Sequence, residues 1–369
     1  LQVEHPVTEM VTGLDLVALQ LHVAMGGTLP PDVMDARSSG HAIEARLYAE
    51  DVAAGFLPSS GTLGRFRWDD LPHVRVDAGY TEGCVVGTHY DAMLAKVIAW
   101  APTRPAAAAR LAHALRTMEI SGVTTNRALL VHTLEQQEFL DGRTDTGFFA
   151  RHDPADLSVP LVSGDEEVTR LVAAAAAALA PRRSPVPAGI PVGWRNVGGA
   201  QQTVQLVTED GRTVDVTCVY GRGGLDVSVG DGDLPGLKVR AVREDVVEID
   251  VGGRRRVFQV VGGSGGWTVT DRIASSWFRE VDRFPGGSGV NRSGSLDSPM
   301  PGAVTQLAVA VGDTVVEGQL VVAIEAMKME HPIHAPHAGT VTDVLVAVAD
   351  QVDTGQTLLV VAPQGEDGR

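Results

Sequence analysis

The chain contains an ungapped internal repeat near its C-terminus, where residues 298–324 align with residues 335–361 at a constant offset of 37. Eleven of the 27 aligned pairs are identical, and valines recur at alternate positions between Gly and Asp. This pattern is typical of short β-strands joined by turns. Each copy is too short to bury a core alone, so the two copies must pack on each other. The repeat predicts an all-β domain with quasi-twofold symmetry at residues 298–363.

The ten residues that connect the two copies contain Lys328, within the sequence Glu-Ala-Met-Lys-Met at 325–329. A lysine at the tip of a symmetric hairpin extends into water, and an exposed amine on a rigid domain suits covalent attachment of a carried group. The alternative is an ordinary surface lysine, as most lysines are. The chain has three lysines and 27 arginines, which argues against a chance lysine at this tip.

This motif, together with Pro-Met-Pro-Gly at 299–302, resembles the biotin carboxyl carrier domain of biotin-dependent carboxylases. In that family the lysine of the motif bears biotin. The resemblance therefore implies that biotin is attached to Lys328, within a motif formed by Glu325, Ala326, Met327 and Met329. Lipoyl domains share the fold but usually place Asp and Ala beside their lysine, so methionine on both sides favours biotin.

Three N-terminal motifs resemble the end of a biotin carboxylase domain, which has the ATP-grasp fold. Leu-Gln-Val-Glu-His-Pro-Val-Thr-Glu at 1–9 is similar to the last catalytic strand of that domain. Gly-His-Ala-Ile-Glu-Ala-Arg-Leu-Tyr-Ala-Glu-Asp at 40–51 and Tyr-Asp-Ala-Met-Leu-Ala-Lys at 90–96 look like its C-terminal subdomain, in the family's order. The resemblance implies a ligase that joins bicarbonate to biotin with ATP.

The same resemblance selects Glu4 and Arg46 as catalytic residues. The family's matching glutamate removes the proton of bicarbonate, and its matching arginine stabilises the enolate-like oxygen that biotin develops. A guanidinium suits this role because it stays cationic and offers several fixed donors. Gln2, Val3 and Glu4 form the implied bicarbonate site, with the Val3 N–H as a donor, and in a strand Gln2 and Glu4 would share one face. The alternatives are that Glu4 is a solvated strand carboxylate and that Arg46 simply pairs with Glu44.

Several parts that the family places before the last catalytic strand are absent from these 369 residues, namely its nucleotide-binding glycine loop, ATP-gripping lysines and metal-binding residues. The chain also begins without methionine, so we expect it to be the C-terminal part of a longer protein. Alone, it should bind ATP poorly and not carboxylate biotin. ATP with Mg²⁺ or Mn²⁺ is expected in the full-length protein, and no metal site is expected within this chain.

The middle of the chain predicts a helix followed by antiparallel strands. Residues 165–179 are helical in composition and end before Pro181, and alternating valines then continue from Trp194 to Phe284. Glycine-rich segments within that region predict hairpin turns, because no helix follows them as a phosphate-binding loop requires. The region opens with Gly-Trp-Arg-Asn at 193–196 and is similar to the linking domain that docks the carboxyltransferase β subunit in acyl-CoA carboxylases.

The remaining elements complete a multidomain α+β fold. Apolar residues at 14, 17, 21 and 25 predict a helix that stops at Gly26, and further helices are predicted at 105–119 and at 126–138, with Thr125 as N-cap. Strands are predicted at 43–48, 75–77 and 96–100. The predicted divisions are an incomplete ATP-grasp subdomain at 1–152, a helix with an antiparallel β-barrel at 153–284, a flexible Gly/Ser linker at 285–297 and a lipoyl-like biotinyl domain at 298–363.

Composition argues against several kinds of partner. A net charge of −16 offers no basic stripe for nucleic acid or an anionic membrane surface. The longest alanine-rich apolar run, residues 171–180, is far shorter than the ~20 residues needed to cross a bilayer. Cys84 and Cys218 lie far apart and fit no metal spacing, so we expect reduced thiols in a cytoplasmic protein.

The sequence therefore predicts the C-terminal portion of a biotin-dependent acyl-CoA carboxylase α subunit. The expected partners are a carboxyltransferase β subunit in a hetero-oligomer, a biotin protein ligase and bicarbonate. The alternatives are a noncatalytic biotin carrier and docking module, and a lipoyl carrier of a 2-oxo acid dehydrogenase. Pyruvate and urea carboxylases are less favoured because they would carry transferase sequence in the same polypeptide. The acyl group, whether acetyl, propionyl or 3-methylcrotonyl, stays open because the β subunit selects it.

Overall fold

The structure, a computed structural model, describes residues 1–180, 201–221, 224–230, 232–233, 236–263, 265–282, 294–326 and 329–363. The chain forms two compact units. The first comprises residues 1–48, 62–84 and 93–282, and the second comprises residues 49–61, 85–92 and 283–369.

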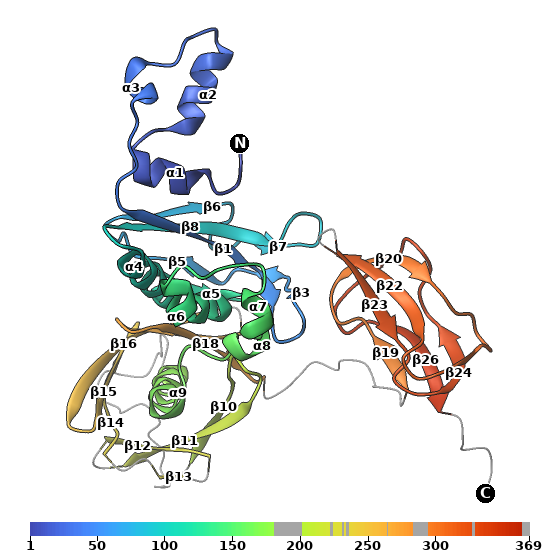
Figure 1. Cartoon of the computed structure of the whole chain (residues 1–369). Coiled ribbons are helices and arrows are strands. Elements are labelled where there is room, and N and C mark those ends of the chain that lie inside the picture. Colours follow the sequence, from blue (N-terminus) through green and yellow to red (C-terminus); the bar gives the residue numbers. More distant parts are fainter. Residues whose placement is uncertain are drawn as a thin grey trace, which may run out of the picture. The chain divides into compact units, whose positions relative to one another are not determined.

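An antiparallel three-stranded sheet organises the N-terminal part of the first unit. Its strand order is β1 (His41–Tyr48), β8 (Met93–Ala101) and β6 (Val74–Ala78), so β1 lies at an edge. Helix α4 (Arg104–Thr117) covers one face, and α1 (His5–Thr12) lies on the other (Figure 1). The strands predicted at 43–48, 75–77 and 96–100 are thus present.

The other N-terminal elements are short. The helices are α2 (Leu16–Ala24), α3 (Pro31–Met34), α5 (Arg127–Glu135), α6 (Gln137–Leu140), α7 (Phe148–Arg151) and α8 (Pro154–Leu157). The paired short strands are β2 (Glu50–Asp51) with β3 (Leu57–Pro58), β4 (Gly61–Thr62) with β7 (Val85–Val86), and β5 (Arg65–Arg67) with β9 (Glu119–Ser121). The residue that precedes α5 is Asn126 rather than the predicted Thr125.

The strand predicted for residues 1–9 is wrong. Residues 1–4 form no strand, and α1 begins at His5. Pro6 has a fixed φ and no N–H, which suits the first turn of a helix, where that N–H has no intrahelical partner. The Val7 N–H donates to the Glu4 carbonyl at 3.0 Å, so the backbone here bonds locally rather than across a ladder. Gln2 and Glu4 therefore do not share a strand face.

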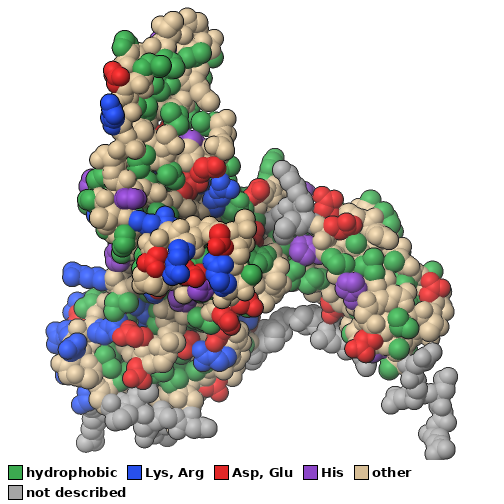
Figure 2. All heavy atoms as spheres, viewed as in Figure 1, with side chains coloured by type: hydrophobic (Ala, Val, Ile, Leu, Met, Phe, Trp, Pro, Cys, Tyr) green, Lys and Arg blue, Asp and Glu red, His purple; other side chains and the backbone are tan. Residues whose placement is uncertain are grey.

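Helix α2 exposes apolar side chains along its length. It begins at Leu16 because the Asp15 carboxylate accepts the N–H of Ala18 at 2.8 Å, an N-cap bond. None of its residues is buried. Figure 2 shows apolar side chains over α2 and α3, and the exposed ones in and near these helices are Val17, Leu21, Val23, Met25, Leu29 and Met34.

Within the described residues, no single helix has the length and apolar content needed to span a membrane. The bent pair α1 and α2, which meet at 102°, passes that test of length and composition together.

A closed β-barrel with a helix through it forms the rest of the first unit. Within the described residues the ring runs β11–β10–β18–β17–β16–β15–β14–β12 and returns to β11. Its strands are β10 (Gln202–Val207), β11 (Thr213–Gly221), β12 (Gly224–Val229), β14 (Lys238–Arg243), β15 (Val246–Val251), β16 (Arg254–Gly263), β17 (Gly266–Thr270) and β18 (Ser275–Glu280). The short strand β13 (Gly232–Asp233) pairs with β12 outside the ring.

Helix α9 (Gly164–Leu179) fills this barrel (Figure 1). Its alanines at 173–177 are buried among barrel residues that include Phe258 and Val216, because only small side chains fit between a helix and strands on all sides. Two of the predicted hairpins are present, since β11 pairs with β12 through Gly221 and Gly224, and β16 pairs with β17 through Gly263 and Gly266. Pro181, predicted to end the helix, lies outside the described residues.

Two four-stranded antiparallel sheets form the C-terminal domain. One has the order β19 (Ser295–Asp297), β26 (Thr357–Pro363), β24 (Gly339–Val344) and β21 (Thr314–Val315). The other has the order β23 (Met329–His334), β22 (Leu320–Ala326), β20 (Gly302–Leu307) and β25 (Gln351–Val352). Shifting β20, β21 and β22 by 37 residues gives β24, β25 and β26, residue for residue.

Backbone hydrogen bonds between the two copies of the repeat are also related by the offset of 37 residues. The Val304 N–H donates to the Asp350 carbonyl at 2.9 Å, and the Val341 N–H donates to the Asp313 carbonyl at 2.9 Å. Each copy therefore supplies backbone partners to the other. This exchange is the structural reason why neither copy can form its sheet alone.

The predicted linker at 285–297 extends too far. Residues 285–293 lie outside the described residues, but Ser295–Asp297 form β19 and pair with β26. Leu296 is buried in the core of the domain, so its apolar side chain outweighs the flexible composition around it. The ordered domain therefore begins before residue 298.

Candidate functional site

The face of the sheet beneath α1 carries charged side chains from all three strands. In β1, Ala45 and Leu47 are buried toward the core, so Glu44 and Arg46 occupy the opposite face. The register aligns Arg46 with Lys96 of β8 and Lys96 with Asp77 of β6. Alternation in the strands thus places a row of charges across the sheet.

Arg46 lies between two carboxylates. Its Nη2 donates to Oε2 of Glu4 at 3.0 Å, and its Nε lies 3.6 Å from Oε1 of Glu44. The Glu4 and Arg46 side chains are 51% and 40% exposed, whereas that of Glu44 is 4% exposed. The structure therefore brings the two predicted catalytic residues together at the surface. It also retains the pairing with Glu44 that was the alternative for Arg46.

Glu44 is a buried carboxylate without a hydrogen-bond donor. Burial raises its pKa above the ordinary value, although the charges of Lys96 and Arg46 act in the opposite direction. Ionised Glu44 is therefore poorly solvated in the fold, and the nearby Arg46 guanidinium, with Nε 3.6 Å from Oε1, offsets part of that cost.

Two cations that the sequence reasoning missed connect this face to the N-terminus. Lys96 donates to the Val3 carbonyl at 3.2 Å and lies 3.6 Å from Asp77. Arg75 donates to Glu9 at 2.6 Å and to Asp77 at 2.7 Å, and thus ties α1 to β6. Burial alone would raise the pKa of Asp77, but Arg75 and Lys96 hold it below its ordinary value. Lys96 is the last residue of the motif at 90–96, and its place in that motif was the sequence signal that could have identified it as a functional residue.

The predicted bicarbonate residues are accessible. Gln2 and Val3 are exposed in the turn before α1, next to Glu4. The Gln2 carbonyl accepts the N–H of His5 at 3.3 Å, and the Val3 carbonyl is held by Lys96. The segment is therefore anchored through its backbone.

Lys328 and Met327 lie outside the described residues, as does the Met329 side chain. The strands on either side are described: β22 and β23 pair as far as Ala326 with Met329. Two residues are left to connect these strands, and Lys328 is one of them. Glu325 faces Glu330 in the same ladder, and both are exposed.

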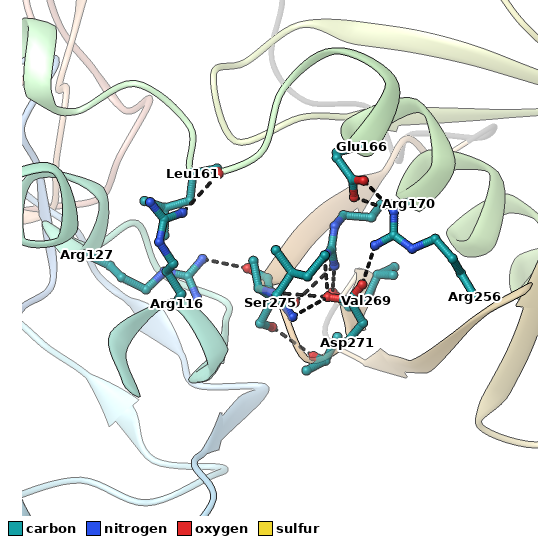
Figure 3. A network of polar contacts seen from close by, with 12 residues as sticks. Arg116, Arg127, Leu161, Glu166, Arg170, Arg256, Val269, Asp271 and Ser275 are labelled. Atoms are coloured by element: carbon teal, nitrogen blue, oxygen red, sulfur yellow. Dashed lines mark hydrogen bonds and ion pairs between the residues drawn. The ribbon is translucent and has the colours of Figure 1, made fainter. Parts of the chain in front are cut away.

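Arginines from two helices bind the turn between β17 and β18 (Figure 3). Arg170 of α9 is fully buried and donates to the carbonyls of Val269 and Ala274 and to the Asp271 carboxylate. Arg127 of α5 donates to the Ser275 carbonyl at 3.0 Å. The barrel and the N-terminal subdomain therefore share this turn.

Three protein families match long segments of the chain, and a fourth matches a short segment at its start. The biotin carboxylase C-terminal domain matches residues 44–151, and the BT domain of the methylcrotonyl-CoA carboxylase alpha-subunit matches residues 165–283. The domain described as biotin-requiring enzyme matches residues 294–361. The ATP binding domain of the carbamoyl-phosphate synthase L chain matches residues 1–31.

Curated relatives agree with these matches. The propionyl-CoA carboxylase alpha chain of Ruegeria pomeroyi is 35% identical over 91% of this chain and 53% of its own length. The mitochondrial methylcrotonoyl-CoA carboxylase subunit alpha of Oryza sativa subsp. japonica is 32% identical over 91% and 51%. The chain therefore contains a biotin carboxylase C-terminal domain, a BT domain and a biotinyl domain, and its relatives are biotin-dependent acyl-CoA carboxylase α subunits. The chain spans about half the length of the curated relatives it matches.

The helix-filled barrel corresponds to the matched BT domain, and the C-terminal domain corresponds to the matched biotinyl domain. The biotinyl match also begins at residue 294, in agreement with strand β19.

Proposed function

We propose that this chain belongs to an enzyme that joins bicarbonate to biotin with ATP and then passes the carboxyl group to an acyl-CoA. The observation that carries the proposal is the contact between Glu4 and Arg46 at 3.0 Å. A carboxylate base and a permanent cation are together at the surface, Glu4 in the segment that matches the ATP binding domain and Arg46 in the biotin carboxylase C-terminal domain, and both are exposed to a small anion.

In this proposal Glu4 takes the proton of bicarbonate and Arg46 stabilises developing negative charge. A carboxylate within hydrogen-bond reach can act as a general base. Arg46 uses Nη2 for Glu4 and directs Nε toward Glu44, so substrate binding would exchange the first contact for one to the reacting anion. Gln2 and the Val3 N–H would complete the bicarbonate site, in an anchored turn rather than a strand.

Lys328 is the proposed attachment site, and the hairpin fits that role. The ladder continues to Ala326 and Met329, and Ala326 is buried, so a rigid platform supports the connection that contains the lysine. Biotin bound there would supply the ureido nitrogen that accepts the carboxyl group.

Biotinylation of the chain tests this part of the proposal. Coexpression with a biotin protein ligase should give the mass increase of one biotin and binding to streptavidin. Lys328→Arg should abolish both, whereas Lys238→Arg, a matched change on the exposed barrel strand β14, should abolish neither. Failure of the wild-type chain to acquire biotin would overturn the assignment.

The partners follow from the domains. The BT domain would dock a separate carboxyltransferase β subunit in a hetero-oligomer, and ATP with Mg²⁺ or Mn²⁺ would bind the ATP-grasp half of the full-length protein. The proposed functional divisions are 1–152, 153–284 and 294–363, and the proposed location is the cytoplasm. Copurification of the full-length protein with a β subunit would identify the acyl-CoA, which the relatives suggest is of propionyl or methylcrotonoyl type.

One measurement, ATP hydrolysis by the full-length protein, distinguishes the proposed enzyme from a noncatalytic biotin carrier. With the ATP-grasp half present, the enzyme should hydrolyse ATP in a reaction that depends on bicarbonate and biotin. A full-length protein that becomes biotinylated but lacks this activity would be a carrier and docking module.

A further inference from the structure

Asn126 immediately precedes helix α5 but does not cap it. Asparagine is among the preferred N-cap residues because its side chain accepts an N–H of the first turn. Here the side chain makes no such bond, although the residue occupies the N-cap position. Asn126 is only 7% exposed, so its amide must find partners elsewhere in the protein.

Its partners are three backbone groups of β1. Oδ1 accepts the N–H of Tyr48 at 3.0 Å, and Nδ2 donates to the carbonyl of Arg46 at 3.2 Å. The Asn126 N–H donates to the carbonyl of Tyr48 at 3.1 Å. A carboxamide carries one acceptor and a donor in the same plane, as a peptide unit does, so Asn126 acts as a neighbouring strand for the edge of the sheet.

The hydrogen bonds from Asn126 reach β1 next to an irregularity in its pairing with β8. β1 is an edge strand, and its pairing with β8 is irregular between Leu47 and Tyr48, one residue after Arg46. Such an irregularity disrupts the ladder locally and bends the strand, so bonds on the other edge of β1 help to set its direction. The Asn126 bonds fix Arg46 and Tyr48 on both sides of the irregularity.

Asn126 is itself held firmly by its neighbour in the chain. Arg127 is 6% exposed and donates to the Met118 carbonyl at 2.8 Å and to the Ser275 carbonyl at 3.0 Å (Figure 3). The first turn of α5 is thereby anchored to the BT barrel, and the amide projects toward β1 from a rigid base.

We propose that Asn126 is a positioning residue for Arg46, which it directs toward Glu4 through the backbone of β1. The inference rests on the proposed function, in which Arg46 stabilises the reacting anion. Asn126 does not touch the substrate. Its effect on the reaction passes through the carbonyl of Arg46.

Asn126→Asp and Asn126→Ser separate this role from helix capping. Aspartate and serine are good N-cap residues, so neither should weaken α5. Aspartate is nearly isosteric but has no N–H for the Arg46 carbonyl, and the serine hydroxyl is too short to span both groups. Thr103→Ala is the matched capping control, because Thr103 does cap α4 by accepting the N–H of Ala106.

The decisive experiment uses the full-length protein and a double-mutant cycle. Asn126→Asp should lower kcat for carboxylation of free biotin roughly 10- to 100-fold while the KM for ATP is unchanged, because a small misplacement of a catalytic group is costly. In an Arg46→Gln background the same change should lower the rate by less than about twofold, since the two residues act in series. Thr103→Ala should leave kcat unchanged. Equal losses in both backgrounds, or full activity of Asn126→Asp, would overturn the proposal.

Hydrogen exchange of this chain tests the contact between Asn126 and β1 without any measurement of biotin carboxylation. Asn126→Ala should increase hydrogen exchange of the Tyr48 amide roughly tenfold or more relative to wild type, whereas Thr103→Ala should not. Unchanged exchange would show that Asn126 does not hold β1. If exchange rises but the wild-type full-length protein does not carboxylate biotin, the proposed function fails and the positioning of Arg46 stands.

Discussion

Arg46 contacts Glu4 across 42 residues of sequence, with Nη2 of the guanidinium 3.0 Å from Oε2 of the carboxylate. Both side chains are accessible, so this pair is poorly placed to stabilise the fold and well placed to meet a small anion.

Arg46→Gln should therefore separate activity from stability. In the full-length protein we expect the rate of biotin carboxylation to fall roughly 10²- to 10³-fold, as for loss of a charge-stabilising donor. Loss of the exposed contact with Glu4 should change the free energy of unfolding by less than about 1 kcal/mol, and buried Glu44 can take up a proton when the charge of Arg46 is removed, because its pKa is already raised. Arg143→Gln removes another exposed, ion-paired arginine and should change neither quantity. Steady-state kinetics and urea titrations would check both, and unchanged kinetics of Arg46→Gln would count against its role.

Ala349 and Gly312 are equivalent positions of the repeat and share a left-handed backbone, with φ of 75° and 95°. Alanine is strained in this conformation, whereas glycine is not. Ala349→Gly should stabilise the biotinyl domain by about 1 kcal/mol, and Gly312→Ala should destabilise it by about as much. Hydrogen exchange of the Val304 and Val341 amides would report both changes. If both variants changed the stability of the domain in the same direction, backbone strain at Ala349 would not be the explanation.

Arg170 is fully buried, and its removal should destabilise the BT barrel. Arg170→Met removes one of the two guanidinium partners of Asp271, leaving Arg256, and also removes the donor to the Val269 and Ala274 carbonyls, so it should cost about 3 kcal/mol. Arg240→Met removes an exposed partner of Asp250 and should cost less than about 1 kcal/mol. Urea unfolding followed by the fluorescence of Trp267 in β17 would measure the difference. If Arg170→Met and Arg240→Met lowered the free energy of unfolding equally, the ion pair of Arg170 with Asp271 would not act as a buried one.

Asp271 should make barrel stability depend on acidity. Burial alone would raise its pKa, but the charge of Arg170 and the N–H groups of Ile273 and Ala274 hold it below the ordinary value. A lowered pKa adds stability above the unfolded pKa of about 4, and this stability is lost as the pH falls through the folded pKa. Asp271→Asn should be less stable than wild type at pH 7, with the difference shrinking below about pH 4. A constant difference across that range would contradict the assignment.

Glu44 should show the opposite dependence. Its pKa is raised by burial, so the stability linked to its protonated form is present below the unfolded pKa and is lost as the pH rises through the folded pKa. Glu44→Gln keeps the shape without the charge and should lose this dependence above about pH 4.3. The variant should be at least as stable as wild type at pH 7. A less stable variant at pH 7 would show that the attraction to Arg46 outweighs burial.

Local patterns were sufficient for much of the fold. Alternation over residues 43–48 predicted β1 and the face that carries Arg46, and the alanine-rich segment at 165–179 predicted α9. The strand expected at residues 1–9 failed because Pro6 favours a helix start, and Leu296 was assigned to a linker because its neighbours are Gly and Ser.

The repeat, the hairpin that contains Lys328 and the charged alternation of β1 were determined by the sequence alone, because each depends on spacings of a few residues or on one constant offset. The roles of Asn126, Lys96 and Arg75 were decided only by the tertiary structure. Their contacts with β1, with α1 and with the turn before α1 join residues that lie 66 to 93 positions apart along the chain. Such contacts arise from strand register and from the packing of α1 and α5, which local periodicity does not specify.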